Sequence, residues 1–252
     1  MNKEIFSDHH NENIFVGEKI GDSDQKWILT TKDIENAEKL YEEEKIHPLN
    51  KQNMFEGGLY CIFSIGETSK KQRNLFKILQ EKKLNTPEQI ISNKDKLKKV
   101  FEGNYKPRNP KRMFGFITKF SSWWMKSNLP QEILDDAKNN IEHNGIKFRD
   151  RLAERKLSDR APGMGPKVAS YFMVLCGYKD VVTIDKHMFD FCEDNFIYPD
   201  ERPDLERGGL WLSRYKKFEE KISEIAKKHG LTPAMFCLAL WTKYSSFSRN
   251  NS

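Results

Sequence analysis

The stretch from Leu157 to Met188 constrains the fold more than any other part of the chain. It reads LSDRAPGMGPKVASYFMVLCGYKDVVTIDKHM. Its PGMG segment interrupts any helix, and Pro166 is suited to the first turn of a new one. The stretch therefore predicts two helices joined by a hairpin, with the second helix beginning at Pro166 and ending near Gly177.

Lys167 and Asp185 are the two residues of this stretch with the clearest chemical potential. Lys167 lies in the first turn of the predicted helix, where free backbone N–H groups and the positive end of the helix dipole disfavour an ammonium ion. A neutral lysine amine shielded from water is a candidate nucleophile that can form a Schiff base. Asp185 follows after one helix and a short return, a length that can bring its carboxylate beside the lysine. It is also well placed to cap the next helix.

The run PGMGPKVAS…VVTIDKHM resembles the helix-hairpin-helix DNA glycosylase superfamily, whose hairpin has the form LPGVGxK and is followed by a V-D-x-H segment. The separation of Lys167 from Asp185 is similar to that in its endonuclease III-like members. In that superfamily the lysine marks bifunctional glycosylase/AP lyases. The resemblance therefore implies that Lys167 is the nucleophile and Asp185 the catalytic carboxylate. Ala161 stands where the family usually has Leu, which indicates local repacking of the hairpin.

The resemblance also implies an all-α fold with two lobes and the hairpin at the cleft between them. The sequence agrees, because it contains no repeat and no strand-rich region. We expect a polar, irregular N-terminal segment followed by one glycosylase domain built of two lobes. The expected boundaries are 1–29 for the polar segment, 30–252 for the domain, 30–65 plus 196–252 for one lobe, 66–195 for the central lobe, and 157–177 for the hairpin.

Two features of the N-terminal half bear on the site. The first clear helix should begin near Thr30, with Asp33 as its capping-box partner, and its acidic end from Glu42 to Glu44 is expected to be solvated. In relatives, a loop between two following helices delivers a Gln or Asn wedge into the space left by a flipped base. The aligned position here is Gly66, so the resemblance leaves the wedge residue unidentified.

Candidate DNA contacts come from two places in the chain. Glycines let a backbone approach a ligand closely, so the amides of Gly163, Met164 and Gly165 are predicted to face a DNA phosphate beside a helix N-terminus. Lys111 and Arg112 lie in the most basic stretch of the chain, at the predicted start of a helix, and are expected to meet phosphate as well.

Three further residues are candidates for the site. The resemblance implies that His187 contacts phosphate, and a helix-surface histidine is the equal alternative. Tyr171 lies one helical turn after Lys167 and faces the same way, so it either lines a base pocket or packs in the core. Trp241 belongs to a final helix that resembles the C-terminal helix of some 8-oxoguanine glycosylases, although a buried tryptophan is the commoner explanation.

Charge and hydropathy limit the partners. The net charge of +6 favours an anionic partner, and nucleic acid is the natural candidate. No apolar run approaches membrane length, and the start MNKEIFSDHHNEN lacks a signal-peptide core. We therefore expect a cytoplasmic, nucleoid-associated monomer that has no membrane partner and acts on double-stranded DNA containing a damaged base.

The four cysteines are expected to be buried free thiols, because they lie far apart in the sequence. Many endonuclease III-like relatives carry a C-terminal four-cysteine iron–sulfur loop, which this sequence does not contain. Paired spacings of Cys or His that suit zinc are also missing. We expect no iron–sulfur cluster, no catalytic zinc and no required cofactor. The resemblance leaves room for a monovalent cation held by main-chain carbonyls of the hairpin.

The resemblance implies base-excision repair, in which a damaged base is flipped out and removed through a Lys167 Schiff base. A β-elimination then nicks the strand. The missing iron–sulfur loop and the tryptophan-containing final helix favour 8-oxoguanine, and an oxidised pyrimidine stays open. The alternative from another class is a non-catalytic helix-hairpin-helix DNA-binding module, in which Lys167 only contacts DNA and Asp185 only caps a helix. A monofunctional glycosylase fits less well, because such relatives usually lack the lysine.

Overall fold

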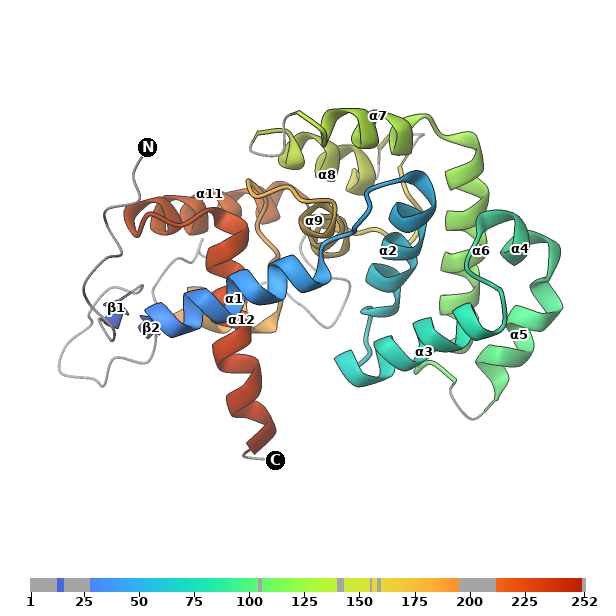
Figure 1. Ribbon diagram of the computed structural model, residues 1–252, viewed down its shortest axis with the longest axis horizontal. Helices are drawn as coiled ribbons and strands as arrows, with labels where there is room; N and C mark the ends of the chain where they lie inside the picture. The colour runs from blue at the N-terminus through green and yellow to red at the C-terminus, as the bar shows by residue number, and fades with distance from the viewer. Residues whose placement is uncertain are drawn as a thin grey trace.

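The computed structural model describes residues 13–15, 28–103, 106–139, 143–154, 156–157, 160–194 and 212–250, and this part of the chain is predominantly helical (Figure 1). The first helices are α1 (Thr31–Glu44), α2 (Lys51–Phe63), α3 (Ser69–Glu81), α4 (Pro87–Ser92), α5 (Lys94–Glu102) and α6 (Pro110–Lys126). They are followed by α7 (Leu129–Asp136), α8 (Gly145–Ala153), α9 (Pro166–Leu175), α10 (Lys186–Asp194), α11 (Leu212–Lys228) and α12 (Pro233–Asn250). The all-α expectation is confirmed.

One small sheet adds to the helical fold. Strands β1 (Asn13–Phe15) and β2 (Ile28–Thr30) pair antiparallel, with Ile14 opposite Leu29. β1 lies inside the segment that the sequence predicts to be irregular. Each strand has three residues, which is too short for alternation of polar and apolar residues to reveal it in the sequence.

The start of α1 follows the sequence prediction. Thr30 Oγ1 accepts a hydrogen bond from the Asp33 amide at 3.2 Å, and Asp33 Oδ2 accepts one from the Thr30 amide at 2.7 Å. This reciprocal pair satisfies two backbone donors that the helix itself leaves free. The predicted capping box is therefore confirmed, and it fixes where α1 leaves the small sheet.

The larger of two hydrophobic clusters unites the middle of the chain. It contains buried side chains of α2 through α9, including Phe55, Phe63, Phe120 and Phe172, each fully buried. In Figure 1, α3, α4, α5 and α6 occupy one end of the molecule, and α9 runs through its centre. Packing in this cluster holds α9, the helix that follows the hairpin, in a fixed position.

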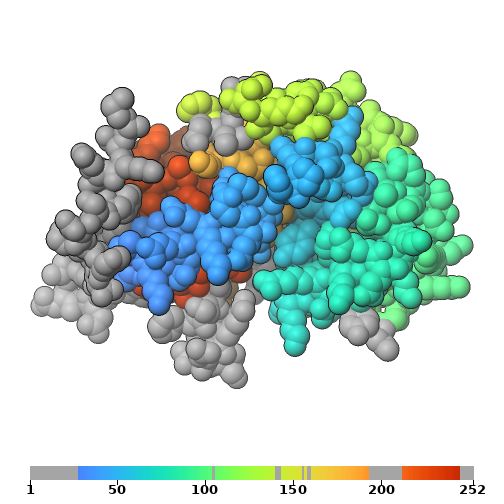
Figure 2. Space-filling model, in the orientation of Figure 1, coloured from blue at the N-terminus to red at the C-terminus, as the bar shows by residue number. Residues whose placement is uncertain are grey.

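The smaller cluster unites both ends of the described chain. It contains Leu29 and Ala37 together with apolar residues of α10, α11 and α12, and α1 packs along α12. On the face shown in Figure 2, α1 and α2 lie between α11 on one side and α3 on the other. The buried side chains of α2 lie in the larger cluster and those of α10 in the smaller one, and the residue boundaries of the two lobes stay a prediction.

The predicted hairpin between α8 and α9 is confirmed. The Ala161 amide donates to the Leu152 carbonyl at 3.1 Å, and Ala161 is fully buried. Gly163 has a φ of +84°, in the left-handed region that favours glycine, and a Cβ there would lie 3.2 Å from Cβ of Phe116. The hairpin thus packs tightly on α6, which fixes the direction in which α9 begins.

None of the helices in the described part of the chain has the length and apolarity to cross a lipid bilayer.

Candidate active site

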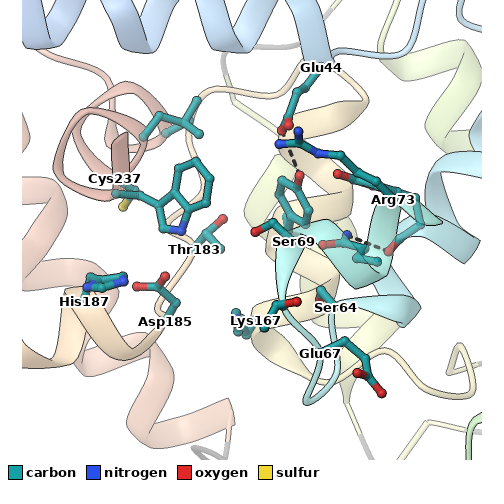
Figure 3. A pocket seen from close by; sticks show the side chains of 17 residues that line it. Glu44, Ser64, Glu67, Ser69, Arg73, Lys167, Thr183, Asp185, His187 and Cys237 are labelled. Atoms are coloured by element: carbon teal, nitrogen blue, oxygen red, sulfur yellow. Dashed lines mark hydrogen bonds between the residues drawn. The ribbon is translucent and has the colours of Figure 1, made fainter. Parts of the chain in front are cut away.

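A cavity of about 330 Å³ lies where the two hydrophobic clusters meet (Figure 3). Its walls come from the end of α1, from α2, α3 and α9, from the segment before α10, and from α10 and α12. The cavity therefore brings together residues from nearly the whole length of the chain. Among the sequence candidates, it is lined by Lys167, Tyr171, Asp185, His187 and Trp241.

Lys167 is the second residue of α9 and points from the helix start into this cavity (Figure 3). Gly165 is the N-cap residue, and Pro166 occupies the first helical position. The lysine side chain is exposed, and its amine makes no ion pair or hydrogen bond with any other described residue. In the described part of the chain, nothing therefore occupies the lone pair or the protons of this amine.

Asp185 faces the same cavity from the segment that returns after α9. Its Oδ1 accepts a hydrogen bond from the Met188 amide at 3.0 Å, and its carbonyl accepts one from the Phe189 amide at 3.0 Å. The predicted N-cap is confirmed. Oδ2 has no hydrogen-bond partner among the described residues, so half of the carboxylate is available to the cavity.

A buried polar network holds the segment that carries Asp185. The Tyr215 hydroxyl accepts from the Ile184 amide at 3.0 Å and donates to the Val182 carbonyl. It also lies 3.1 Å from Ser170 Oγ on α9, the helix that carries Lys167. Because Tyr215 is 2% exposed, these bonds are sheltered from water, and they tie the two predicted catalytic residues to one another through the interior.

The same network contains a buried ion pair. Arg149 of α8 is fully buried and binds Glu219 of α11 through both terminal nitrogens, with Nη1 at 3.1 Å from Oε1. Glu219 Oε1 also accepts from the Val182 amide at 3.2 Å. Burial raises the pKa of Glu219, and the charge of Arg149 opposes that rise. The pair thus joins α8 and α11 to the segment that carries Asp185.

Replacing Tyr215 with phenylalanine should lower the free energy of unfolding by about 1–3 kcal/mol, because it leaves the Ile184 amide and the Val182 carbonyl buried without a partner. Urea denaturation followed by circular dichroism would measure this difference. A variant as stable as the unchanged protein would show that water or a shifted backbone replaces the hydroxyl.

Tyr171 and Trp241 both lie in the cavity wall and are only partly buried, so neither is a simple core residue. The Tyr171 hydroxyl donates to Glu44 Oε2 at 2.8 Å. Burial, followed by the charge of Glu44, raises the pKa of Tyr171 well above its usual value, so the hydroxyl keeps its proton and acts as a donor. Trp241 contributes an aromatic surface on the α12 side.

Gly163, Met164 and Gly165 do not line the cavity. Met164 is 2% exposed, and its amide donates to the Ala161 carbonyl at 3.2 Å, so that amide is already used within the hairpin. Gly165 is exposed, and its amide has no partner among the described residues. The Met164 amide is therefore engaged within the hairpin, and the contacts of Gly163, Met164 and Gly165 with phosphate stay predictions.

Lys111 and Arg112 are exposed at the start of α6 and do not line the cavity. The Arg112 guanidinium lies 5.1 Å from the centre of the Phe116 ring, and Phe116 packs against Gly163. The basic start of α6 is thereby placed next to the hairpin, so both can contact one length of DNA backbone.

The sequence interpretation missed several residues of the cavity. Glu44 was expected at a solvated helix end, and this expectation is wrong, because Glu44 is partly buried in the cavity wall. Arg73 and Thr183 also line the cavity without having been singled out. The sequence near Glu44 gave no signal of this, because Glu42 and Glu43 lie in the same helical turn and are exposed.

All four cysteines are buried and free, as the sequence predicts. Burial raises the pKa of each thiol, including Cys237 in the cavity wall, so they stay protonated. Among the residues that the structure describes, no cluster of His, Cys, Asp and Glu could hold a metal ion.

The chain is similar to known proteins in sequence and in fold. Residues 34–231 match the family model described as 8-oxoguanine DNA glycosylase. An 8-oxoguanine DNA glycosylase/AP lyase of Picrophilus torridus is 32% identical over 111 residues, which cover 44% of this chain and 48% of that protein. The corresponding enzyme of Korarchaeum cryptofilum is 33% identical over 95 residues, covering 37% and 43%. The chain thus matches about half the length of these relatives.

Solved structures share the fold. The Methanocaldococcus jannaschii 8-oxoguanine glycosylase/lyase, in complex with 15mer DNA containing 8-oxoguanine, aligns with a TM-score of 0.65 at 20% identity, covering 85% of this chain and 96% of that one. The 8-oxoguanine DNA glycosylase of Thermotoga maritima aligns with a TM-score of 0.64 at 20% identity, covering 84% and 94%. Since the family model covers most of the chain, this protein belongs to the 8-oxoguanine DNA glycosylase family.

Proposed function

We propose that this protein is a DNA glycosylase and AP lyase of base-excision repair that removes 8-oxoguanine and then nicks the strand. The observation that carries the proposal is the convergence of Lys167 and Asp185 on one cavity. Among the described residues, the lysine amine has no partner there and one oxygen of the aspartate is free. Membership of the 8-oxoguanine DNA glycosylase family supports the choice of base.

The chemistry begins with a base that leaves the duplex, because a base within the stack cannot reach the amine. The neutral amine of Lys167 forms a bond to C1′ of the sugar while the bond from C1′ to the base breaks. The electron pair leaves with the base, which gains the proton that the newly bonded amine loses. Asp185 stabilises the positive charge that develops on the sugar.

Strand cleavage follows from the covalent adduct. Opening of the sugar ring gives a Schiff base between Lys167 and C1′, which makes the hydrogens on C2′ acidic. Loss of a C2′ proton and cleavage of the bond from C3′ to its phosphate oxygen nick the strand on the 3′ side. The Schiff base with Lys167 is itself the group that activates the sugar for elimination, so these steps require no cofactor.

DNA binding is assigned to the surface around the cavity. Proposed phosphate contacts in the hairpin are the exposed amide of Gly165 and the backbone of Gly163. Lys111 and Arg112 are proposed to bind phosphates of the same DNA strand region, and His187, which lines the cavity, is proposed to contact phosphate there. A monovalent cation at the hairpin carbonyls remains part of the proposal. One chain supplies every proposed catalytic residue, which supports a monomeric enzyme. Its proposed substrate is double-stranded DNA, and its proposed location is the nucleoid within the cytoplasm.

Borohydride trapping tests the proposal directly, because it reduces a Schiff base to a stable covalent adduct. Purified protein would be incubated with duplexes that contain 8-oxoguanine, thymine glycol, an abasic site or no lesion. We expect adducts on the 8-oxoguanine and abasic duplexes. Strongest trapping on thymine glycol would assign the protein to oxidised pyrimidines. No adduct on any duplex, with DNA binding intact, would instead support the non-catalytic DNA-binding module.

A further inference from the structure

The end of the cavity away from Lys167 carries a carboxylate in an unusual position. Glu44 is the last residue of α1, where the negative end of the helix dipole disfavours a second negative charge. It is also partly buried, and burial raises its pKa. Glu42 and Glu43 in the same turn are exposed and pair with lysines, whereas Glu44 forms no ion pair with another described residue.

Tyr171 fixes the direction of this carboxylate. Its hydroxyl donates to Glu44 Oε2 at 2.8 Å, and Oε1 has no hydrogen-bond partner among the described residues. Tyr171 lies on α9, one helical turn after Lys167. The acceptor Oε1 is therefore oriented relative to the proposed nucleophile by a single rigid helix.

Arg73 of α3 supplies a donor at the same end of the cavity. Figure 3 shows Glu44 and Arg73 at one end of the view and Lys167 and Asp185 at the other. The charge of Arg73 favours the ionised form of Glu44, yet the two side chains form no ion pair with each other within 4.0 Å. An acceptor and a donor thus line the cavity without neutralising one another.

Oxidation of guanine at C8 creates an edge that fits this pair. In guanine, N7 is a hydrogen-bond acceptor and C8 carries only hydrogen. In 8-oxoguanine, N7 carries a hydrogen and becomes a donor, and the neighbouring O8 is an acceptor. A carboxylate beside a guanidinium presents the complementary order, acceptor next to donor.

We propose that Glu44 and Arg73 recognise the C8 edge of oxidised guanine, with Glu44 Oε1 accepting from N7–H and Arg73 donating to O8. This inference rests on the proposed function. Trp241 provides a face on which the base can stack, and Tyr171 acts as a positioning residue for Glu44. Guanine is rejected because its N7 lone pair would face the carboxylate, which leaves a desolvated charge unpaired.

The test compares Glu44→Gln with Glu43→Gln. Glu43 is the exposed neighbour on the same helix end, so its replacement removes the same charge outside the cavity. In Glu44→Gln, the Tyr171 hydroxyl holds the amide oxygen and the amide nitrogen faces the base, where it opposes N7–H as donor against donor. Single-turnover removal of 8-oxoguanine should slow by about tenfold to hundredfold in Glu44→Gln and change less than about twofold in Glu43→Gln.

The abasic duplex separates this inference from the proposed function. It has no base for Glu44 to contact, so Glu44→Gln should cleave it at the rate of the unchanged protein. If the unchanged protein cleaves neither duplex, the proposed function fails. If it cleaves both and Glu44→Gln removes 8-oxoguanine at an unchanged rate, base recognition by Glu44 is overturned. Equal slowing on both duplexes would also overturn it, because the effect would then lie in the chemistry.

A second comparison identifies the base edge. 8-Methoxyguanine keeps the oxygen on C8 and the whole pairing edge but lacks N7–H. On a Lys167→Gln background, Glu44→Gln should weaken binding of an 8-oxoguanine duplex by about tenfold or more. It should strengthen binding of an 8-methoxyguanine duplex, because the amide nitrogen can donate to the N7 lone pair that the carboxylate repels. Equal weakening of both would place Glu44 against another edge of the base and overturn the assignment.

Discussion

Replacement of Lys167 with glutamine should abolish the borohydride-trapped adduct and slow removal of 8-oxoguanine by at least about 10³-fold. Glutamine has no nucleophilic amine, so neither the bond to C1′ nor the Schiff base can form. Fold stability should stay nearly unchanged, because the Lys167 side chain is exposed and has no partner among the described residues. Gel separation of trapped and free DNA would measure the adduct.

Lys186→Gln is the matched control for that experiment. Lys186 is exposed, follows Asp185 directly and lies outside the cavity wall, so its replacement removes one positive charge beside the site. We expect Lys186→Gln to form the adduct at the level of the unchanged protein. An adduct of undiminished yield in Lys167→Gln would mean that another amine attacks the sugar and that the assignment of Lys167 is wrong.

Replacement of Asp185 with asparagine should slow base removal by about 10²–10³-fold, because the amide cannot stabilise the positive charge that develops on the sugar. The N-cap should survive, since an asparagine oxygen can accept the hydrogen bond that Oδ1 now takes from the Met188 amide at 3.0 Å. Activity and stability are therefore expected to separate in this variant. Single-turnover kinetics would measure the loss of activity, and thermal unfolding of the same sample would measure whether stability is kept.

Asp190→Asn supplies the comparison on the same helix. Asp190 lies in α10 but not in the cavity wall, so we expect base removal at the rate of the unchanged protein. If Asp185→Asn removes the base at a rate within about threefold of the Asp190→Asn rate, Asp185 is only a helix cap and the assigned catalytic role is wrong.

Prediction from the sequence succeeded where a feature depends on neighbours in the chain. The PGMG hairpin, the start of α9 at Pro166, the Thr30 capping box and the cap at Asp185 are all present. Each depends on backbone conformation and on hydrogen bonds within a few residues, which residue types fix locally. The placement of Lys167 and Asp185 in one cavity also agrees with the expectation, because only one helix and a short return separate them.

Prediction failed for Glu44 because the reason for its burial lies far away in the chain. Its partner Tyr171 is on α9, and Arg73 is on α3. The local pattern around Glu44 is an acidic helix end, which in most proteins is solvated. Nothing within a few residues of it indicates that α1 ends against α9.

The sequence by itself determined the helices, the hairpin and the identity of the proposed nucleophile and carboxylate, because these follow from short-range geometry and from a motif. Only the tertiary structure decided which further side chains complete the cavity and which backbone amides stay free. The buried Arg149–Glu219 pair and the Met164 amide show why. Such contacts are chosen by the packing of helices that are distant in sequence, and packing depends on the shape of the whole interior.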